Sequence, residues 1–320
     1  MLIPGPTATA SPAHVRAGAN GPQTRRPTRI PRAAVPWLLV APILLLIAGF
    51  VAIPLLSVFW NSVFKKNLTK PWSNGFVGLD NFHKLLFDDP LFWESLGFTV
   101  KWVAIQLVFQ LVIGLVLALI VNEAFKGRGV VRSIVFSPWA ISGVLTTAIW
   151  LLVYNPGTGV FRMLGDLGVG DGNTALLASP STVVGAAAVA ELWRGVPFFA
   201  IMLLADLQSA PKDLYEAASI DGAGRYQRFR YVTLPHLKNA IVLTTLLRGV
   251  WEFNNVDLLY TMTNGGPVNM TTTLPLYVAK MATVSHELGY GSAATVLAFV
   301  ILLGLSIVYL KLTNFGKGHA

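Results

Sequence analysis

Six long apolar runs constrain what this chain can fold into more than any other feature of its sequence. Each is close to the ~20 mostly apolar residues that an α-helix needs to cross a hydrocarbon core of ~30 Å. The runs cover residues 36–59, 96–121, 134–154, 182–207, 240–262 and 292–312. The sequence therefore predicts an all-α membrane protein with six transmembrane helices.

The composition agrees with this class. Of the 320 residues, 54% are apolar and 12% are charged, whereas about 25% are charged in an average soluble domain. The net charge of +9 would indicate nucleic-acid binding only on a soluble surface, so we expect no nucleic-acid partner. The absence of cysteine excludes disulfides and thiolate metal ligands, and no histidine has metal-ligand spacing.

The lysines and arginines between the runs predict the orientation, because cytoplasmic loops carry the excess of these residues. If the N-terminus is cytoplasmic, the inside segments hold 15 of the 24 and the outside segments hold 6. Lys101, Arg194 and Arg248 lie within the runs and complete the total. We therefore expect both termini on the cytoplasmic side.

The first 35 residues differ from the rest of the chain. They are rich in Pro, Ala, Thr and Arg and have no apolar periodicity, which predicts a disordered basic cytoplasmic tail over 1–35 and a six-span domain over 36–320. A cleaved signal peptide is the alternative. The first apolar run is longer than a typical signal-peptide core, and no A-x-A site follows it.

A polar segment with several arginines, 214–235, separates the fourth and fifth runs. Pro211 suits a first helical position, and the helix should run to about Ile220, where glycines stop it. A second short helix fits residues 225–232, with Pro235 ending it. The sequence thus predicts a cytoplasmic helix-turn-helix loop over 209–238. On composition alone, a basic hairpin attracted to anionic lipid explains the segment equally well.

The same segment resembles the EAA loop of ATP-binding-cassette importer permeases, through which they engage their ATPases. The family pattern is EAA, three residues, Gly, nine residues, an aliphatic residue, one residue, then LP. The residues that match it, including the DGA variant of the sugar importers, are Glu216, Ala217, Ala218, Asp221, Gly222, Ala223, Val232, Leu234 and Pro235. The resemblance extends over roughly residues 35–315. Asp206 departs from the family's usual glycine, and Asn239 stands where a proline often follows.

The resemblance implies a non-catalytic subunit that forms half of a heterodimeric importer pore in a bacterial plasma membrane. The implied partners are a second permease subunit, two ATPase subunits, an external substrate-binding protein and the lipid bilayer. The implied cargo is a sugar or a sugar-like solute. No G-x-x-x-x-G-K-[ST] phosphate loop occurs in the chain. We therefore expect no cofactor here and place ATP and Mg on the partner ATPase.

Charged residues inside the apolar runs need an explanation, because each costs ~2.5–3.5 kcal/mol at the centre of a membrane helix. Glu191 and Arg194 are three residues apart, and Arg248 and Glu252 are four apart, so each pair can neutralise itself on one helix face. The alternative is a polar cavity between two permease subunits, in which aromatic rings and amides would receive a sugar. The sequence leaves both interpretations open.

The resemblance to sugar permeases of the maltose type also implies cavity positions. By motif they fall on Glu191, Gly195, Phe198, Arg248, Trp251, Glu252 and Asn255. Arginine and glutamate replace small or neutral residues there, which argues against maltose itself. Arg248 could serve a phosphate-bearing solute such as a glycerophosphodiester, although Glu252 beside it weakens that argument. Gln106 and Gln110 fit interhelical hydrogen bonds better than substrate contacts.

Two other classes of protein remain as alternatives. An ion-coupled secondary transporter would use midplane carboxylates such as Glu252 or Asp257 as coupling sites. A membrane-embedded enzyme would need a nucleophile or metal constellation, and the sequence has none. Neither class explains the spacing of the EAA segment.

Overall fold

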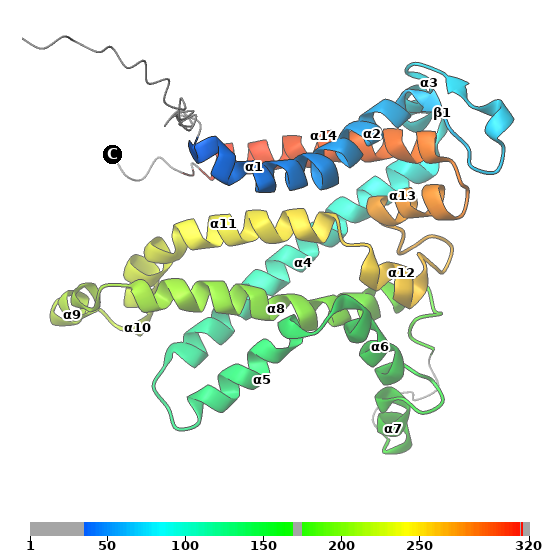
Figure 1. The fold of residues 1–320 in the computed structure, drawn as a ribbon. Coiled ribbons are helices and arrows are strands. Elements are labelled where there is room, and N and C mark those ends of the chain that lie inside the picture. The colour runs from blue at the N-terminus through cyan, green and yellow to red at the C-terminus, as the bar shows by residue number, and fades with distance from the viewer. Residues whose placement is uncertain (1–34, 169–174, 314, 316–320) are drawn as a thin grey trace, which may run out of the picture. The chain divides into compact units, whose positions relative to one another are not determined.

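The computed structural model describes residues 35–168, 175–313 and 315. The chain divides into two units, 1–53 and 54–320, which are described separately. In the first, α1 (Val35–Ile47) leads into a π-helical turn, Ala48–Ala52. The predicted basic tail lies almost entirely outside the described residues. The second unit contains all the predicted site residues (Figure 1).

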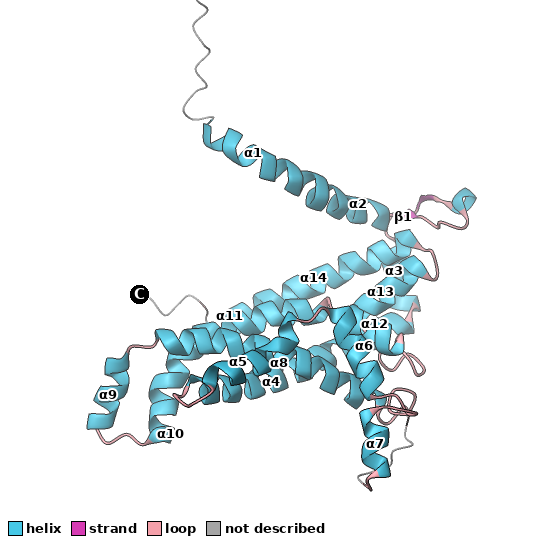
Figure 2. Cartoon of the chain, turned by 60° about the horizontal axis from the view of Figure 1, so that its bottom comes forward, coloured by secondary structure: helices cyan, strands magenta, loops and turns pink. Residues whose placement is uncertain are grey.

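The second unit is predominantly helical (Figure 2). Two short antiparallel strands, β1 (Phe64–Lys65) and β2 (Gly75–Phe76), pair Phe64 with Phe76. The helices are α2 (Ile53–Ser62), α3 (Asp80–His83), α4 (Pro90–Asn122), α5 (Arg128–Ala140), α6 (Gly143–Val153), α7 (Val160–Asp166), α8 (Val183–Ser209), α9 (Lys212–Ile220), α10 (Arg225–Arg228), α11 (Leu234–Phe253), α12 (Asp257–Thr263), α13 (Leu274–Thr283) and α14 (Leu288–Leu312).

Among the described residues, four helical segments are long and apolar enough to cross a membrane. They are Pro36–Ser62, α4, α8 and α14. The pair α5 and α6 counts as a fifth only if it is one span, because it is bent by 102°. The predicted continuous helix over 134–154 is therefore wrong. Ser142 explains the break, since its Oγ accepts a hydrogen bond from the backbone N of Leu145 at 3.4 Å and caps a new helix.

The predicted helix over 240–262 is also interrupted. α11 ends at Phe253 and α12 begins at Asp257, and α11 is not among the candidate spans. Asn254 follows the last turn of α11, and its side-chain amide donates to the carbonyl of Val250 at 2.8 Å. Asparagine side chains compete in this way with helical backbone bonds. Six continuous membrane helices are thus more than the described residues provide.

The closest helix packing joins α4 to α8 and depends on small residues. A Cβ atom at Gly114 would lie 2.5 Å from Cβ of Phe199 and 3.2 Å from the backbone N of Ala200. A Cβ atom at Gly195 would lie 2.3 Å from the Gln110 side chain. Glycine at these positions allows two backbones to approach closely, as in other membrane helix pairs.

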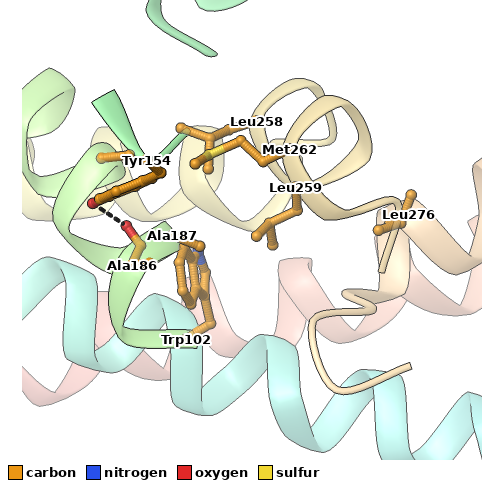
Figure 3. Packing of buried hydrophobic residues seen from close by; sticks show 9 residues of the cluster. Trp102, Tyr154, Ala186, Ala187, Leu258, Leu259, Met262 and Leu276 are labelled. Atoms are coloured by element: carbon orange, nitrogen blue, oxygen red, sulfur yellow. Dashed lines mark hydrogen bonds between the residues drawn. The ribbon is translucent and has the colours of Figure 1, made fainter. Parts of the chain in front are cut away.

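At one end of the unit, α6 and α12 pack onto α4 and α8 (Figure 3). Trp102, Ala187, Leu258 and Met262 are buried there. The hydroxyl of Tyr154 donates to the carbonyl of Ala186 at 2.9 Å. This cluster holds the broken helices against the long ones, at the end opposite α9 and α10 (Figure 1).

Asp89 ties α4 to α13 and α14. Its Oδ1 accepts from the backbone N of Phe92 at 3.1 Å and caps α4. Its Oδ2 accepts from the hydroxyls of Tyr277 at 2.5 Å and Tyr290 at 2.9 Å. Burial, and then this hydrogen bond, raise the pKa of Tyr277. A hydroxyl that keeps its proton remains a donor to Asp89, so the link persists at neutral pH.

Candidate functional site

The first helix of the predicted coupling loop ends as its sequence indicates. α9 stops at Ile220, and Gly222 has a φ of +76°. The N–H of Ala223 donates to the carbonyl of Ala218 at 2.9 Å, and the N–H of Gly222 donates to Ser219 at 3.1 Å. These two bonds form a Schellman motif, in which glycine takes the left-handed conformation. The predicted end of this helix is therefore confirmed.

The second helix of the loop does not end at Pro235. α10 continues through a π-helical turn, Phe229–Thr233, into α11, and Pro235 lies in the first turn of α11. In a regular helix the proline ring clashes with the carbonyl four residues earlier. The preceding turn is wider here, since the N–H of Leu234 donates five residues back to Phe229. The loop thus joins α11 without a break.

Two side-chain bonds brace the loop internally. The hydroxyl of Tyr215 lies 3.1 Å from Oγ1 of Thr233 and connects α9 to the π-helical turn. Nη1 of Arg228 donates to Oγ of Ser219 at 3.1 Å. The pattern residues remain accessible: Glu216, Ala217, Asp221, Gly222 and Pro235 are exposed, and Ala218, Ala223 and Leu234 are half-buried.

The two charge pairs predicted inside the apolar runs form one buried cluster. Nη2 of Arg248 on α11 donates to Glu191 on α8 at 2.5 Å and to Glu252 at 2.9 Å. Nε of Arg248 donates to Oε1 of Gln110 on α4 at 2.8 Å. All four side chains are buried, with Glu191 at 0% and Arg248 at 5% exposure. Breaking such a buried pair leaves an uncompensated charge, so the cluster depends on every member.

Further donors complete the cluster. Nε1 of Trp102 donates to Glu252 at 2.9 Å, and Nδ2 of Asn255 donates to Glu191 at 3.2 Å. Nη1 of Arg194 lies 3.8 Å from Oε2 of Glu191. The predicted pair of Arg248 and Glu252 therefore forms, whereas Glu191 lies closer to Arg248 than to its predicted partner Arg194. The prediction that Gln106 and Gln110 bond between helices is confirmed, since Gln106 also donates to the carbonyl of Ala188 at 3.2 Å.

A hollow of about 570 Å³ lies beside this cluster. Its lining residues are Trp139, Ile141, Ser142, Gly143, Arg194, Arg248, Val250, Trp251, Asn254, Asn255, Val256 and Asp257. Of the predicted cavity residues, Arg248, Trp251 and Asn255 line it. Both breaks in the helices, at 141–142 and 254–256, also face this hollow, which is how membrane proteins accommodate irregular backbone.

The remaining predicted cavity residues do not line the hollow. Glu191 and Glu252 are buried in the cluster, and Gly195 packs against Gln110. Phe198 is buried, with its ring centroid 5.1 Å from that of Trp251. Ser142 and Gly143 were not predicted. Their signal in the sequence is a serine followed by a glycine, shortly after Pro138 and within an apolar run.

Among the residues that the structure describes, no group of three or more His, Cys, Asp or Glu side chains is placed to hold a metal ion. The side chains that line the hollow provide aromatic faces, amides and charges of both signs. Trp139 and Trp251 are each 45% exposed and supply the accessible aromatic surface in its wall. Surfaces of this kind suit a polar organic solute with C–H faces.

Residues 110–314 match the family model described as "Binding-protein-dependent transport system inner membrane component". The trehalose/maltose transport system permease protein MalF of Thermococcus litoralis is 37% identical, over 89% of this chain and 95% of that protein. The sulfoquinovosyl glycerol transport system permease protein SmoG of Agrobacterium fabrum is 34% identical, over 86% and 89%. The trehalose transport system permease protein SugA of Mycobacterium tuberculosis is 32% identical, over 90% and 92%.

The fold also matches solved structures. A chain of a bacterial ABC transporter involved in the import of the acidic polysaccharide alginate superposes with a TM-score of 0.73 at 23% identity, over 87% of this chain and 95% of that one. The alginate transporter in complex with its alginate pentasaccharide-bound periplasmic protein gives 0.74 at 22% identity, over 89% and 97%. At these identities the likeness establishes the fold alone.

Proposed function

The chain belongs to the family of binding-protein-dependent transport system inner membrane components, and from this premise we propose that it forms half of the pore of an ATP-driven sugar importer. It is the non-catalytic, multi-pass subunit of an inner-membrane transporter. Members of this family carry no cofactor themselves. ATP and Mg belong to two ATPase subunits in this proposal, and a second permease subunit supplies the other half of the pore.

The coupling loop is the observation that carries the proposal. A braced helix, glycine turn and helix present Glu216 and Gly222 on an exposed surface. Ile220 and Tyr226 are 86% and 77% exposed at the same loop. Large apolar side chains on a polar loop favour burial by a partner protein, and a short helix that seats in a groove is a common recognition mode. We assign that groove to the ATPase.

The hollow beside Arg248 is our proposed substrate path, with Trp251 and Asn255 as its contact residues. Trp139 and Trp251 offer aromatic faces to a sugar ring, and the amides of Asn254 and Asn255 suit hydroxyl groups. Arg248 is already bonded to two carboxylates, which weighs against it as a phosphate ligand. Two of the relatives are named as permeases for trehalose or maltose, which supports a similar disaccharide as the solute here.

For the membrane arrangement we propose six crossings of a bacterial plasma membrane, with both termini cytoplasmic. This count treats the bent pair α5 and α6 as one crossing and α11 with α12 as another. Arg248 and Glu252 keep the mean hydropathy of α11 low. Because their charges are neutralised within the protein, this need not prevent a crossing.

Glu216→Lys tests the proposal in the complete transporter, reconstituted in proteoliposomes with its binding protein. Uptake should be abolished while the chain remains in the membrane, because the charge that faces the ATPase is reversed. Gly222→Ala should also lower uptake, since φ of +76° strains alanine. Gly224→Ala is the matched control, because φ is −68° there. Normal uptake and substrate-stimulated ATP hydrolysis in Glu216→Lys would refute the assignment, and uptake driven by an ion gradient without ATPase would favour a secondary transporter.

A further inference from the structure

The start of α11 is hydrogen-bonded to the end of α8 through one imidazole. Nε2 of His236, in the first turn of α11, lies 3.1 Å from the backbone O of Asp206 and 3.3 Å from Oγ of Ser209. α8 ends at Ser209 and α11 begins at Leu234. The three residues therefore meet where the coupling loop leaves one long helix and enters the next (Figure 1). We call them the loop clasp.

The chemistry of the clasp follows from the helix end. Asp206 lies in the last turn of α8, where carbonyls lack partners within the helix. A carbonyl oxygen only accepts, so the bond to Asp206 requires a proton on Nε2 of His236. Oγ of Ser209 donates to the same carbonyl at 2.7 Å. An imidazole is well suited to this position, because histidines near a helix C-terminus bond its last carbonyls and oppose its negative dipole end.

The carboxylate of Asp206 provides a second reason for the contact. Its Oδ2 is buried and has no hydrogen-bond partner among the described residues. Nε2 of His236 lies 3.9 Å from this oxygen. A buried carboxylate oxygen without a partner is costly, so approach of the imidazole is favourable. His236 thus faces two acceptor groups of one residue on α8.

The loop between the clasped ends is itself braced. The bond between Tyr215 and Thr233 connects α9 to the π-helical turn, and Thr233 is 5% exposed. Arg228 adds a bond to Ser219. In a loop that keeps its own shape, the relative position of the two ends decides whether a push on α9 moves α8 and α11 together. His236 adds a directional bond between these ends to the packing of Leu237 against Leu203 and Leu207.

We propose that His236 is a positioning residue for coupling, which holds the ends of the loop together so that α8 and α11 respond as one body to the ATPase. This inference rests on the proposed function, since it assumes a partner that moves the loop. Without the clasp, ATP hydrolysis should continue, but part of the movement of the ATPase should bend the loop and not move α8 and α11. The expected defect is therefore a poorer ratio of transport to hydrolysis.

The test compares single variants of the complete transporter with its ATPases and binding protein in proteoliposomes. In His236→Ala we expect ATP hydrolysed per solute molecule to rise about fivefold, the factor that one net hydrogen bond is worth. His236→Gln should restore the ratio to within about twofold, since its amide can donate to the same carbonyl. His83→Ala is the matched control, because His83 lies 3.8 Å from Asp88 in an exposed pair far from the loop in the chain. Its ratio should not change.

A distance measurement separates positioning from general stability. The chain has no cysteine, so spin labels can be attached to Gln208→Cys and Lys238→Cys, which are both exposed. The distance distribution should be narrow with His236 or Gln at position 236 and broad with Ala. Ser209→Ala, an exposed change that spares the fold, should raise the ATP ratio in the same direction by a smaller factor.

The outcomes are distinct. An unchanged ATP ratio in His236→Ala overturns the clasp, as does a defect in His236→Ala that Gln does not repair. The proposed function is tested separately by Glu216→Lys. If that variant transports normally, the loop is not the coupling element and both proposals fall. If Glu216→Lys is inactive and His236→Ala is normal, the clasp alone is wrong.

Discussion

Arg248 holds together three helices with one guanidinium group. It reaches Gln110 on α4, Glu191 on α8 and Glu252 on its own helix. The sequence predicts two separate pairs, because spacing along a helix identifies only neighbours three and four residues apart. It does not predict the bond between Arg248 and Glu191, which exists because α8 and α11 pack side by side. The position of Glu191 at the centre of the cluster therefore depends on tertiary packing.

Arg248→Met should be strongly destabilising, because it leaves Glu252 buried without a counter-ion and leaves Glu191 with only the 3.8 Å contact to Arg194. We expect a loss of about 3–5 kcal/mol in the free energy of unfolding, measured as a lowered midpoint of thermal unfolding in detergent. The triple change that adds Glu191→Gln and Glu252→Gln should recover much of this loss. Arg230→Met, at an exposed arginine, serves as control and should stay within about 0.5 kcal/mol. Equal effects of the two single changes would contradict a central role for Arg248.

The sequence predicted some helix ends correctly and missed others. The end of α9 at Gly222 could be predicted, because a positive φ strongly favours glycine. The breaks at 141–142 and 254–256 could not, because hydropathy measures apolar length and does not register a single capping serine or asparagine. The hollow lies between those breaks. Among the residues that line it, the family resemblance predicted Trp251 and Asn255 as cavity residues. Ser142 and Gly143, which lie at a helix break, were missed.

The contact between α4 and α8 should be sensitive to one methyl group at one position. In Gly114→Ala the new Cβ meets Phe199 at 2.5 Å and backbone atoms of α8 at 3.2 Å, so the helices must separate. Overpacking of this kind costs about 1–3 kcal/mol, measured by the same thermal unfolding. Gly97→Ala lies on the same helix with no atom within 4 Å of the added Cβ and should be neutral or stabilising. Equal stability of the two variants would show that the helices are not this close.

At the scale of the whole molecule, the distribution of basic residues predicts which side of the membrane each segment lies on, whereas helix length leaves the number of crossings open. The excess of basic residues in alternate loops predicts a sidedness for every segment, whereas within the described part of the chain four or five helices qualify as spans by length and composition. The bent pair α5 and α6 decides between these readings. If it crosses the membrane, the segments before α4 and after α8 lie on opposite sides. If it turns back, they lie on the same side.

Single cysteines in this cysteine-free chain can resolve the crossing. Lys70→Cys, before α4, should react with a membrane-impermeant maleimide in intact cells, because it lies in a predicted outside segment. Lys212→Cys, at the start of α9, should react only after permeabilisation. Both positions are exposed, and the unmodified chain provides the unlabelled background. Labelling of both from the outside would mean that α5 and α6 form a re-entrant hairpin.

The π-helical turn between α10 and α11 sets the azimuth of the coupling loop. Each residue of a regular helix advances by about 100°, and a π-helical turn holds an extra residue that leaves this progression locally out of step. If all five residues of Phe229–Thr233 formed regular i→i+4 bonds instead, the progression would not be interrupted, and α9 would point in a different direction around the axis of α11. The direction in which the loop presents its EAA residues is therefore encoded in the hydrogen-bond register of five residues. A chain with the same EAA residues and a regular helical turn at this point would present those residues in a different direction.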